Sequence, residues 1–261
     1  MNYIIGEEYE LPSLGKVYDR EVKPIVKLRS MTTNEEMKRL SPSKDRAYKN
    51  MAEILDDCLV EDIGISAYDL CLGDYQFLMH KLRVVTYGSE YPLECKCPYC
   101  LSTTEETLDL DSLPVNKYTD DLLDCLEFDL PQSKKHIKLR MQTPRILDDV
   151  AIAVRDFRKR APAFQGDPAF LFTLKSLIVA IDGEKPDPVF VEQWIRELPM
   201  ADANYILKKS DKLVEGIGLK LDLEITCPIC GLTYETPFRV NQEFFRPDIQ
   251  SWRHALRTRT L

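Results

Sequence analysis

The sequence predicts an α+β protein in which a discontinuous β module is interrupted by a mostly helical insertion and preceded by a small N-terminal β/α region. Three observations predict this class. Two Cys-Pro-x-Cys turns lie 130 residues apart, each between stretches of alternating apolar and polar residues. The residues between the turns contain four helical patterns. Short strand patterns flank a Pro-Ser-Leu-Gly turn near the N-terminus.

These patterns divide the chain into four parts. The parts are 1–90 (N-terminal β-hairpin plus helices), 91–112 with 219–242 (the two halves of the β module), 113–218 (hairpin plus helical insertion) and 243–261 (basic tail).

In the N-terminal part, Thr33 followed by Glu36 forms a capping box, which predicts a short helix through Leu40. Ser41-Pro42 then predicts the start of a second helix, which Gly64 ends. A break at Gly73-Asp74 precedes a third predicted helix, from Tyr75 to about Thr86.

The insertion is expected to begin with a hairpin formed by 126–130 and 137–141, since both segments alternate. Four helices should follow it. They are Pro144–Arg160, a helix capped by Asp167-Pro168 that runs to Ile181, a helix capped by Asp187-Pro188, and a last helix over roughly Ala201–Val214.

The two cysteine turns match beyond their cysteines. At the offset of 130, Leu93-Glu94 falls on Leu223-Glu224 and Glu105 falls on Glu235. Each half therefore reads as strand, tight turn, strand, and together the turns supply four thiolates. Four thiolates are the ligand set of a tetrahedral structural Zn²⁺. We predict a zinc-ribbon-like module whose ligands are Cys97, Cys100, Cys227 and Cys230. Since the ion would join the ends of the insertion, its loss should open the molecule.

Other roles for the cysteines remain open. A Cys-Pro-Tyr-Cys turn also resembles the redox motif of glutaredoxins, but that chemistry needs a helix after the first cysteine, and a strand pattern follows here. Disulfides or inert thiols are further alternatives. Cys95 could replace a ligand, although its counterpart is Ile225. The other three cysteines, Cys58, Cys71 and Cys125, lie in apolar patterns typical of buried positions.

Composition restricts the function classes. The 261 residues carry a net charge of −8, which argues against broad nucleic-acid binding. No apolar run is long enough for a membrane span, and the acidic start lacks the basic region of a signal peptide, so we expect synthesis in a cytoplasm. With three histidines and acidic pairs that read as solvated charge, among them Asp148-Asp149, we expect no enzyme activity.

The C-terminal tail differs in character from the rest. Two interpretations stay open for it: a solubilising end, or a segment that docks on an acidic partner. The candidate partner-binding residues are Phe244, Phe245, Arg246, Trp252, Arg253 and Arg257.

The order of several motifs resembles the T4-type baseplate protein family of contractile-tailed bacteriophages. The motifs are residues 10–18 (ELPSLGKVY), 26–29 (VKLR), 31–36 (MTTNEE), 73–74 (GD), 83–88 (RVVTYG), 181–183 (IDG) and 198–199 (LP), together with both cysteine turns and Phe244-Phe245. Members are described as baseplate hub subunits or hub assembly proteins. The resemblance implies zinc ligation by the same four cysteines, and it does not extend to the arginine-rich end.

The resemblance implies a structural protein of the virion, in the hub region of the tail baseplate. Its partners would be hub, tube or wedge proteins, without membrane or nucleic acid, and several copies would lie in a symmetric assembly. The alternatives are a baseplate assembly factor that is absent from the virion, a zinc-ribbon regulator that binds nucleic acid, and a thiol oxidoreductase.

Overall fold

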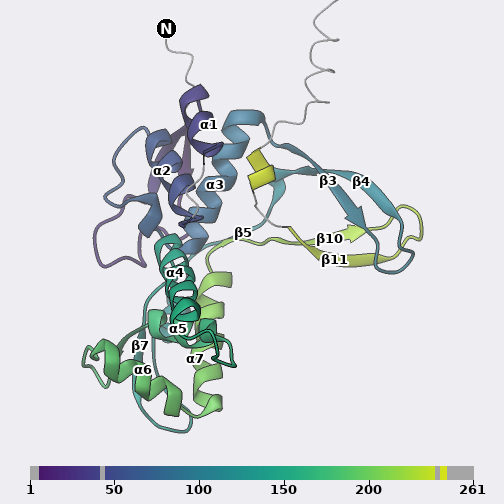
Figure 1. Ribbon diagram of the computed structural model, residues 1–261. Coiled ribbons are helices and arrows are strands. Elements are labelled where there is room, and N and C mark those ends of the chain that lie inside the picture. The colour runs from purple at the N-terminus through teal and green to yellow at the C-terminus, as the bar shows by residue number, and fades with distance from the viewer. Residues whose placement is uncertain (1–5, 42–44, 239–241, 246–261) are drawn as a thin grey trace, which may run out of the picture.

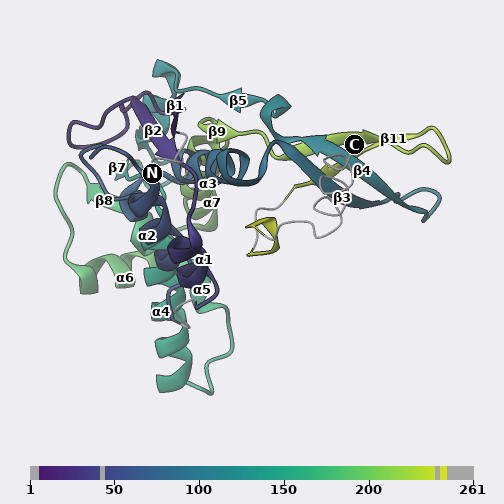
Figure 2. The same ribbon diagram turned by 90° about the horizontal axis from the view of Figure 1, so that it is seen from above.

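The computed structural model describes residues 6–41, 45–238 and 242–245 and confirms the α+β class (Figure 1). An N-terminal lobe (residues 6–88) lies above a helical lobe (residues 115–219), and a two-hairpin arm projects to one side of both. The view from above shows the same projection of the arm (Figure 2). Within the described ranges, no helix combines the length and the apolar character that crossing a membrane requires.

The N-terminal lobe packs three helices against one hairpin. Strand β1 (Gly6–Glu10) pairs antiparallel with β2 (Ile25–Arg29). The three helices are α1 (Thr33–Arg39), α2 (Lys49–Cys58) and α3 (Leu72–Tyr87), and the 3-10 turn η1 (Ala67–Asp69) lies between α2 and α3. Apolar side chains of β2, α2 and α3 share one core, because each element presents its apolar positions to the others.

Helix α1 begins one residue earlier than the capping box predicted. Thr32 is the N-cap, and the Glu35 side chain closes the box by accepting from the Thr32 backbone at 2.6 Å. Glu35 also accepts from Arg29 of β2, whereas Glu36 pairs with Arg39 on its own helix. The additional contact with β2 favours Glu35 as the capping residue.

Helix α2 begins at Lys49 and ends at Cys58, so the predicted start at Ser41-Pro42 and end at Gly64 are wrong. No side chain of its own segment caps it. Instead the buried Asp148 of α4 (Pro144–Arg160) accepts from the backbone amides of Tyr48 and Lys49, at 3.1 and 3.2 Å. The helix starts where another element supplies the acceptor. Pro42 lies outside the described residues.

The helical lobe contains a three-stranded sheet and four helices. In chain order its elements are η3 (Asp120–Cys125), β6 (Glu127–Asp129), β7 (His136–Leu139), α4 (Pro144–Arg160), α5 (Pro168–Leu177), β8 (Ile178–Ile181), α6 (Pro188–Glu197) and α7 (Met200–Glu215). The hairpin is confirmed, as are α4 and the caps Asp167 and Asp187. The helix predicted to run to Ile181 stops at Leu177, because the β-branched run that follows pairs with β7.

The two connections to the helical lobe pair with each other. Strand β5 (Val115–Asn116) lies antiparallel to β9 (Gly218–Leu219). The start of α3 packs directly on this crossing: a Cβ at Gly73 would lie 2.1 Å from the Ile217 carbonyl oxygen, and Gly218 has φ +110°. Only glycine fits such a backbone approach. The ends of the insertion are therefore joined at this crossing.

Candidate metal centre

The arm consists of two hairpins with matching registers. Strand β3 (Glu90–Lys96) pairs with β4 (Thr103–Asp109), and β10 (Asp222–Thr226) pairs with β11 (Thr233–Pro237). Glu94 lies opposite Glu105 in the first hairpin, as Glu224 lies opposite Glu235 in the second. The predicted offset of 130 thus holds in register. Each cysteine turn connects the two strands of its hairpin, at the end of the arm away from the lobes (Figures 1 and 2).

The two turns also have the same backbone structure. The Cys97 amide donates to the Ser102 carbonyl at 2.9 Å and the Leu101 amide donates to the Cys97 carbonyl at 3.0 Å. In the second turn, the Cys227 amide donates to the Leu232 carbonyl at 3.0 Å and the Gly231 amide to the Cys227 carbonyl at 2.8 Å. Both turns place one residue in the left-handed region, Leu101 at φ 62° and Gly231 at φ 73°.

The sulfur atoms of the four predicted ligands form one cluster. Cys97 Sγ lies 3.8 Å from Cys230 Sγ, Cys100 Sγ lies 3.7 Å from Cys227 Sγ, and all four lie within 4.8 Å of one another. A regular tetrahedron with metal–sulfur bonds of about 2.3 Å has sulfur–sulfur edges of about 3.8 Å. The cluster therefore has the donor set and the spacing of a tetrathiolate metal site.

The thiols of the cluster differ in acidity. Backbone amides of the turn, Cys230 first, donate to Cys227 and lower its pKa to about 6. A backbone hydrogen bond from Leu232 favours the Cys230 thiolate, but partial desolvation and the neighbouring sulfurs of Cys227, Cys100 and Cys97 outweigh it and raise the pKa of Cys230 to about 11. Repulsion among four thiolates is what a bound cation relieves.

The other cysteines are not part of the four-sulfur cluster. Cys95 is buried in β3, with its sulfur 4.0 Å from the Leu93 carbonyl oxygen. Cys58, Cys71 and Cys125 are buried in the lobes, and burial raises the pKa of Cys58 to about 12. A strand follows each cysteine turn, so neither turn has the helix that lowers the thiol pKa in glutaredoxin-type sites.

An aromatic cluster fixes the base of the arm to the N-terminal lobe. Phe244, in the 3-10 turn η4 (Gln242–Phe245), contacts Tyr91 of β3 and Phe238 after β11. Arg83 of α3 donates to the Phe244 carbonyl oxygen at 3.0 Å. Phe244 and Phe245 are buried.

This burial is a correction to the partner-binding prediction for these two residues. Phe244 and Phe245 fill the interior of this chain and offer no exposed surface. The other candidates for partner binding, Arg246, Trp252, Arg253 and Arg257, lie outside the described residues.

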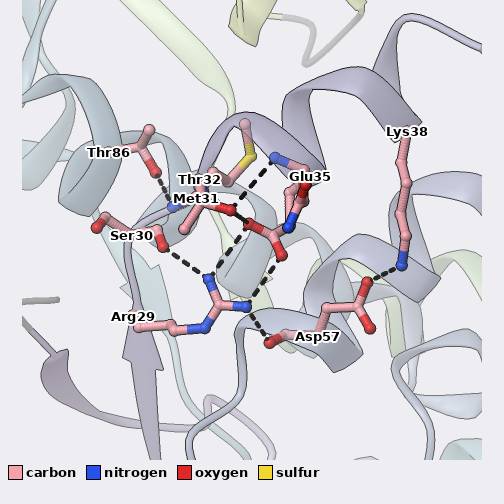
Figure 3. Close-up of polar contacts among 9 residues, drawn as sticks. Arg29, Ser30, Met31, Thr32, Glu35, Lys38, Asp57 and Thr86 are labelled. Atoms are coloured by element: carbon pink, nitrogen blue, oxygen red, sulfur yellow. Dashed lines mark hydrogen bonds and ion pairs between the residues drawn. The ribbon is translucent and has the colours of Figure 1, made fainter. Parts of the chain in front are cut away.

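A second polar site lies where α1 meets β2 and α2 (Figure 3). Both terminal nitrogens of Arg29 donate to Glu35, and one of them also reaches the Asp57 carbonyl oxygen at 2.7 Å. Burial raises the pKa of Glu35, but hydrogen bonds from Arg29 and Thr32 outweigh this effect and lower it to about 2. The Met31 amide donates to Thr86 of α3, and Lys38 pairs with Asp57. With these charges paired to one another, the site holds α1 in place.

Sequence reasoning missed several buried carboxylates, among them Asp148 and Asp74. The prediction that Asp148 is solvated is wrong: it is 2% exposed and caps α2. Asp74 is fully buried and accepts from the Ser13 amide at 2.9 Å and the Tyr18 hydroxyl at 2.7 Å, so it fixes the turn after β1. The sequence predicted a break at Gly73-Asp74, but both residues lie in α3, which begins at Leu72. The role of Asp74 was missed because its partners Ser13 and Tyr18 are some 60 residues away.

Comparison with known proteins agrees with the motifs. A family model described as T4 bacteriophage base plate protein matches residues 4–246. No curated protein and no solved structure matches the chain significantly. The match spans both lobes and the arm, including all four cysteines of the cluster. The chain therefore belongs to the T4 bacteriophage base plate protein family.

Proposed function

We propose that this protein is a structural subunit of the hub region of a phage tail baseplate, and that a structural Zn²⁺ stabilises its arm. The match of the baseplate family to residues 4–246 carries the proposal. The family supports a structural role in the tail, and the four-sulfur cluster supports the metal.

The chemistry of the cluster suits a structural ion. Cys97, Cys100, Cys227 and Cys230 would hold Zn²⁺ by four sulfurs, which leaves no position for a water molecule or a substrate. The ion would balance the thiolate charge and join the tips of the two hairpins. Such a closed site supports no hydrolytic chemistry, so we assign the protein no enzyme activity.

The tip of the arm is suited to contact with another protein. Four apolar side chains around the cluster are at least half exposed: Tyr99, Leu101, Ile229 and Leu232. Apolar side chains grouped at one exposed tip are typical of protein interfaces. The partners in this proposal are other tail or baseplate proteins, and several copies of the chain lie in a symmetric assembly.

Mass spectrometry of purified virions tests the location. A hub subunit is present in finished particles at a fixed ratio to the other baseplate proteins. Presence in infected cells together with absence from virions would instead identify a baseplate assembly factor. Retention on DNA that weakens with salt would favour the nucleic-acid alternative, which the acidic strands of the arm disfavour.

Metal analysis of the purified chain tests the ion. We expect one zinc per chain, lost in Cys227→Ser and kept in Cys95→Ala, because Cys95 is a buried cysteine beside the cluster that is not a ligand in this proposal. Zinc loss in both variants, or in neither, would contradict the ligand assignment.

A further inference from the structure

A groove of about 270 Å³ lies between the two hairpins of the arm. Leu93, Leu108, Leu223 and Ile225 contribute its apolar lining, and Glu106 and Glu224 lie among the lining residues. The lining from β3, β4 and β10 therefore combines four apolar side chains with two carboxylates and two threonines.

Charge on the arm is unbalanced. Residues 90–109 and 222–237 contain eight carboxylates and one lysine. Three pairs of carboxylates lie directly opposite each other across the strands: Glu90 and Asp109, Glu94 and Glu105, Glu224 and Glu235. Among the described residues, none of the eight forms an ion pair.

This arrangement costs stability in the isolated arm, since like charges directly opposite in a sheet repel. An apolar groove beside unpaired carboxylates is complementary to a segment that combines an aromatic side chain with several cations.

The chain itself contains such a segment. Residues 246–261 carry four arginines, one aspartate and Trp252. The segment follows Phe245, which is anchored at the base of the arm. Trp252 lies seven residues beyond that anchor, a span of roughly 23 Å when extended. Strand β3 is also seven residues long, so the tryptophan can reach any part of the groove.

We propose that the groove between the two hairpins binds residues 246–261 of the same chain, with the Trp252 ring in the groove and the arginines against the arm carboxylates. Attachment at Phe245 keeps the segment at a high effective concentration beside its own arm, which favours the same chain over a second copy.

Tryptophan fluorescence of the full-length chain tests the proposal. The sequence contains two tryptophans, so in the Trp194→Phe background the emission comes from Trp252 alone. A docked Trp252 emits at short wavelength with high anisotropy. Combined Glu105→Gln, Glu106→Gln and Glu224→Gln substitutions should shift this emission to the red and lower the anisotropy. These substitutions relieve repulsion within the arm, so circular dichroism should show an intact fold.

A matched control removes the same charge elsewhere. Asp124→Asn, Glu184→Gln and Asp211→Asn change three exposed carboxylates of the helical lobe and should leave the emission unchanged. Neutralising Arg253, Arg257 and Arg259 to glutamine should reproduce the red shift of the arm variant. Solvent-exposed emission from Trp252 in the starting chain would overturn the proposal, and so would equal effects of the two carboxylate triples. Emission that changes on dilution would also overturn it, since that result identifies a second copy as the source.

Discussion

At the scale of single residues, His80 is the least satisfied polar group of the core. It is fully buried against the Phe244 ring, and neither ring nitrogen makes a hydrogen bond of good geometry within the described residues, although the Leu110 backbone favours its protonated form. Burial lowers the pKa of His80 from 6.5 to about 4. The positive charges of Lys81 and Arg83 add to this effect, and the negative charge of Asp111 opposes it. Folded His80 is therefore neutral near pH 7.

This burial predicts that the protein loses stability in mild acid. Between pH 6.5 and 4, His80 is protonated in the unfolded chain but stays neutral in the folded chain. As the pH falls through this range, the free energy of unfolding therefore decreases by up to about 1.4 kcal/mol per pH unit. The free energy of unfolding, measured by urea unfolding at pH 7 and pH 5, should decrease less in His80→Met than in the starting chain, because the contribution of His80 is removed. The same substitution at exposed His136 is the control. An unchanged pH dependence in His80→Met would contradict the interpretation.

A second prediction compares the two cysteine turns. Leu101 adopts the left-handed conformation that Gly231 adopts in the other turn, at a cost of about 1 kcal/mol for a residue with a Cβ. Leu101 is also 68% exposed, so its side chain contributes little packing. Leu101→Gly should stabilise the metal-loaded arm, and Gly231→Ala should destabilise it by about 1 kcal/mol. Hydrogen exchange of the strand amides measures both, and a destabilising Leu101→Gly would contradict the strain argument.

At the scale of the elements, α2 depends on a cap from another helix. Removal of the Asp148 carboxylate leaves two backbone amides and the Tyr68 hydroxyl without their acceptor. Asp148→Ala should therefore lower the free energy of unfolding by about 2–4 kcal/mol. Asp149→Ala, next to it, removes an exposed ion pair with Arg46 and should cost less than about 1 kcal/mol. Similar losses in both variants, measured by urea unfolding, would argue against the cap.

How much the sequence predicts depends on how local each signal is. Signals that involve residues only a few positions apart were predicted correctly. They include the cysteine turns, the hairpin of β6 and β7, and the helices that begin with a proline. The start of α2 could not be predicted, because its cap lies 100 residues away at Asp148. The run Ile178–Ile181 continues an apolar helix pattern, and only its partner β7 makes it a strand.

For the candidate site too, the sequence predicted the residues with local signals and missed the contacts between distant segments. Spacing and the matching flanks found the four cysteines. Phe244 and Phe245 looked like part of an exposed tail, because nothing in their own segment indicates the aromatic partners Tyr91 and Phe238.

At the scale of the whole molecule, the arm and the lobes are joined independently of the metal. The sequence led to the expectation that loss of the ion opens the molecule. In the structure the sulfur cluster lies at the tips of the hairpins, while the ends of the insertion pair through β5 and β9 and the aromatic cluster fixes the base of the arm.

We therefore now expect chelation to have a local effect. A strong chelator should release the ion and increase hydrogen exchange and proteolysis in β3, β4, β10 and β11. The helical circular dichroism should stay nearly unchanged, since α1 to α7 lie in the two lobes. A cooperative loss of helical signal on chelation would show that the ion holds the lobes as well. Cys227→Ser, which holds no ion in this proposal, is the control: any effect of the chelator on this variant is nonspecific.

The separation of the two cysteine turns also sets a temporal order. Cys97 and Cys100 leave the ribosome long before Cys227, and at about 5–20 residues per second the interval for some 130 residues is on the order of ten seconds. During that time the nascent chain presents two unshared thiols while the whole helical lobe is being synthesised. A product truncated before residue 227 lacks two of the four cysteines and can never complete the cluster. Metal binding by all four cysteines would therefore require that nearly the whole chain has been translated.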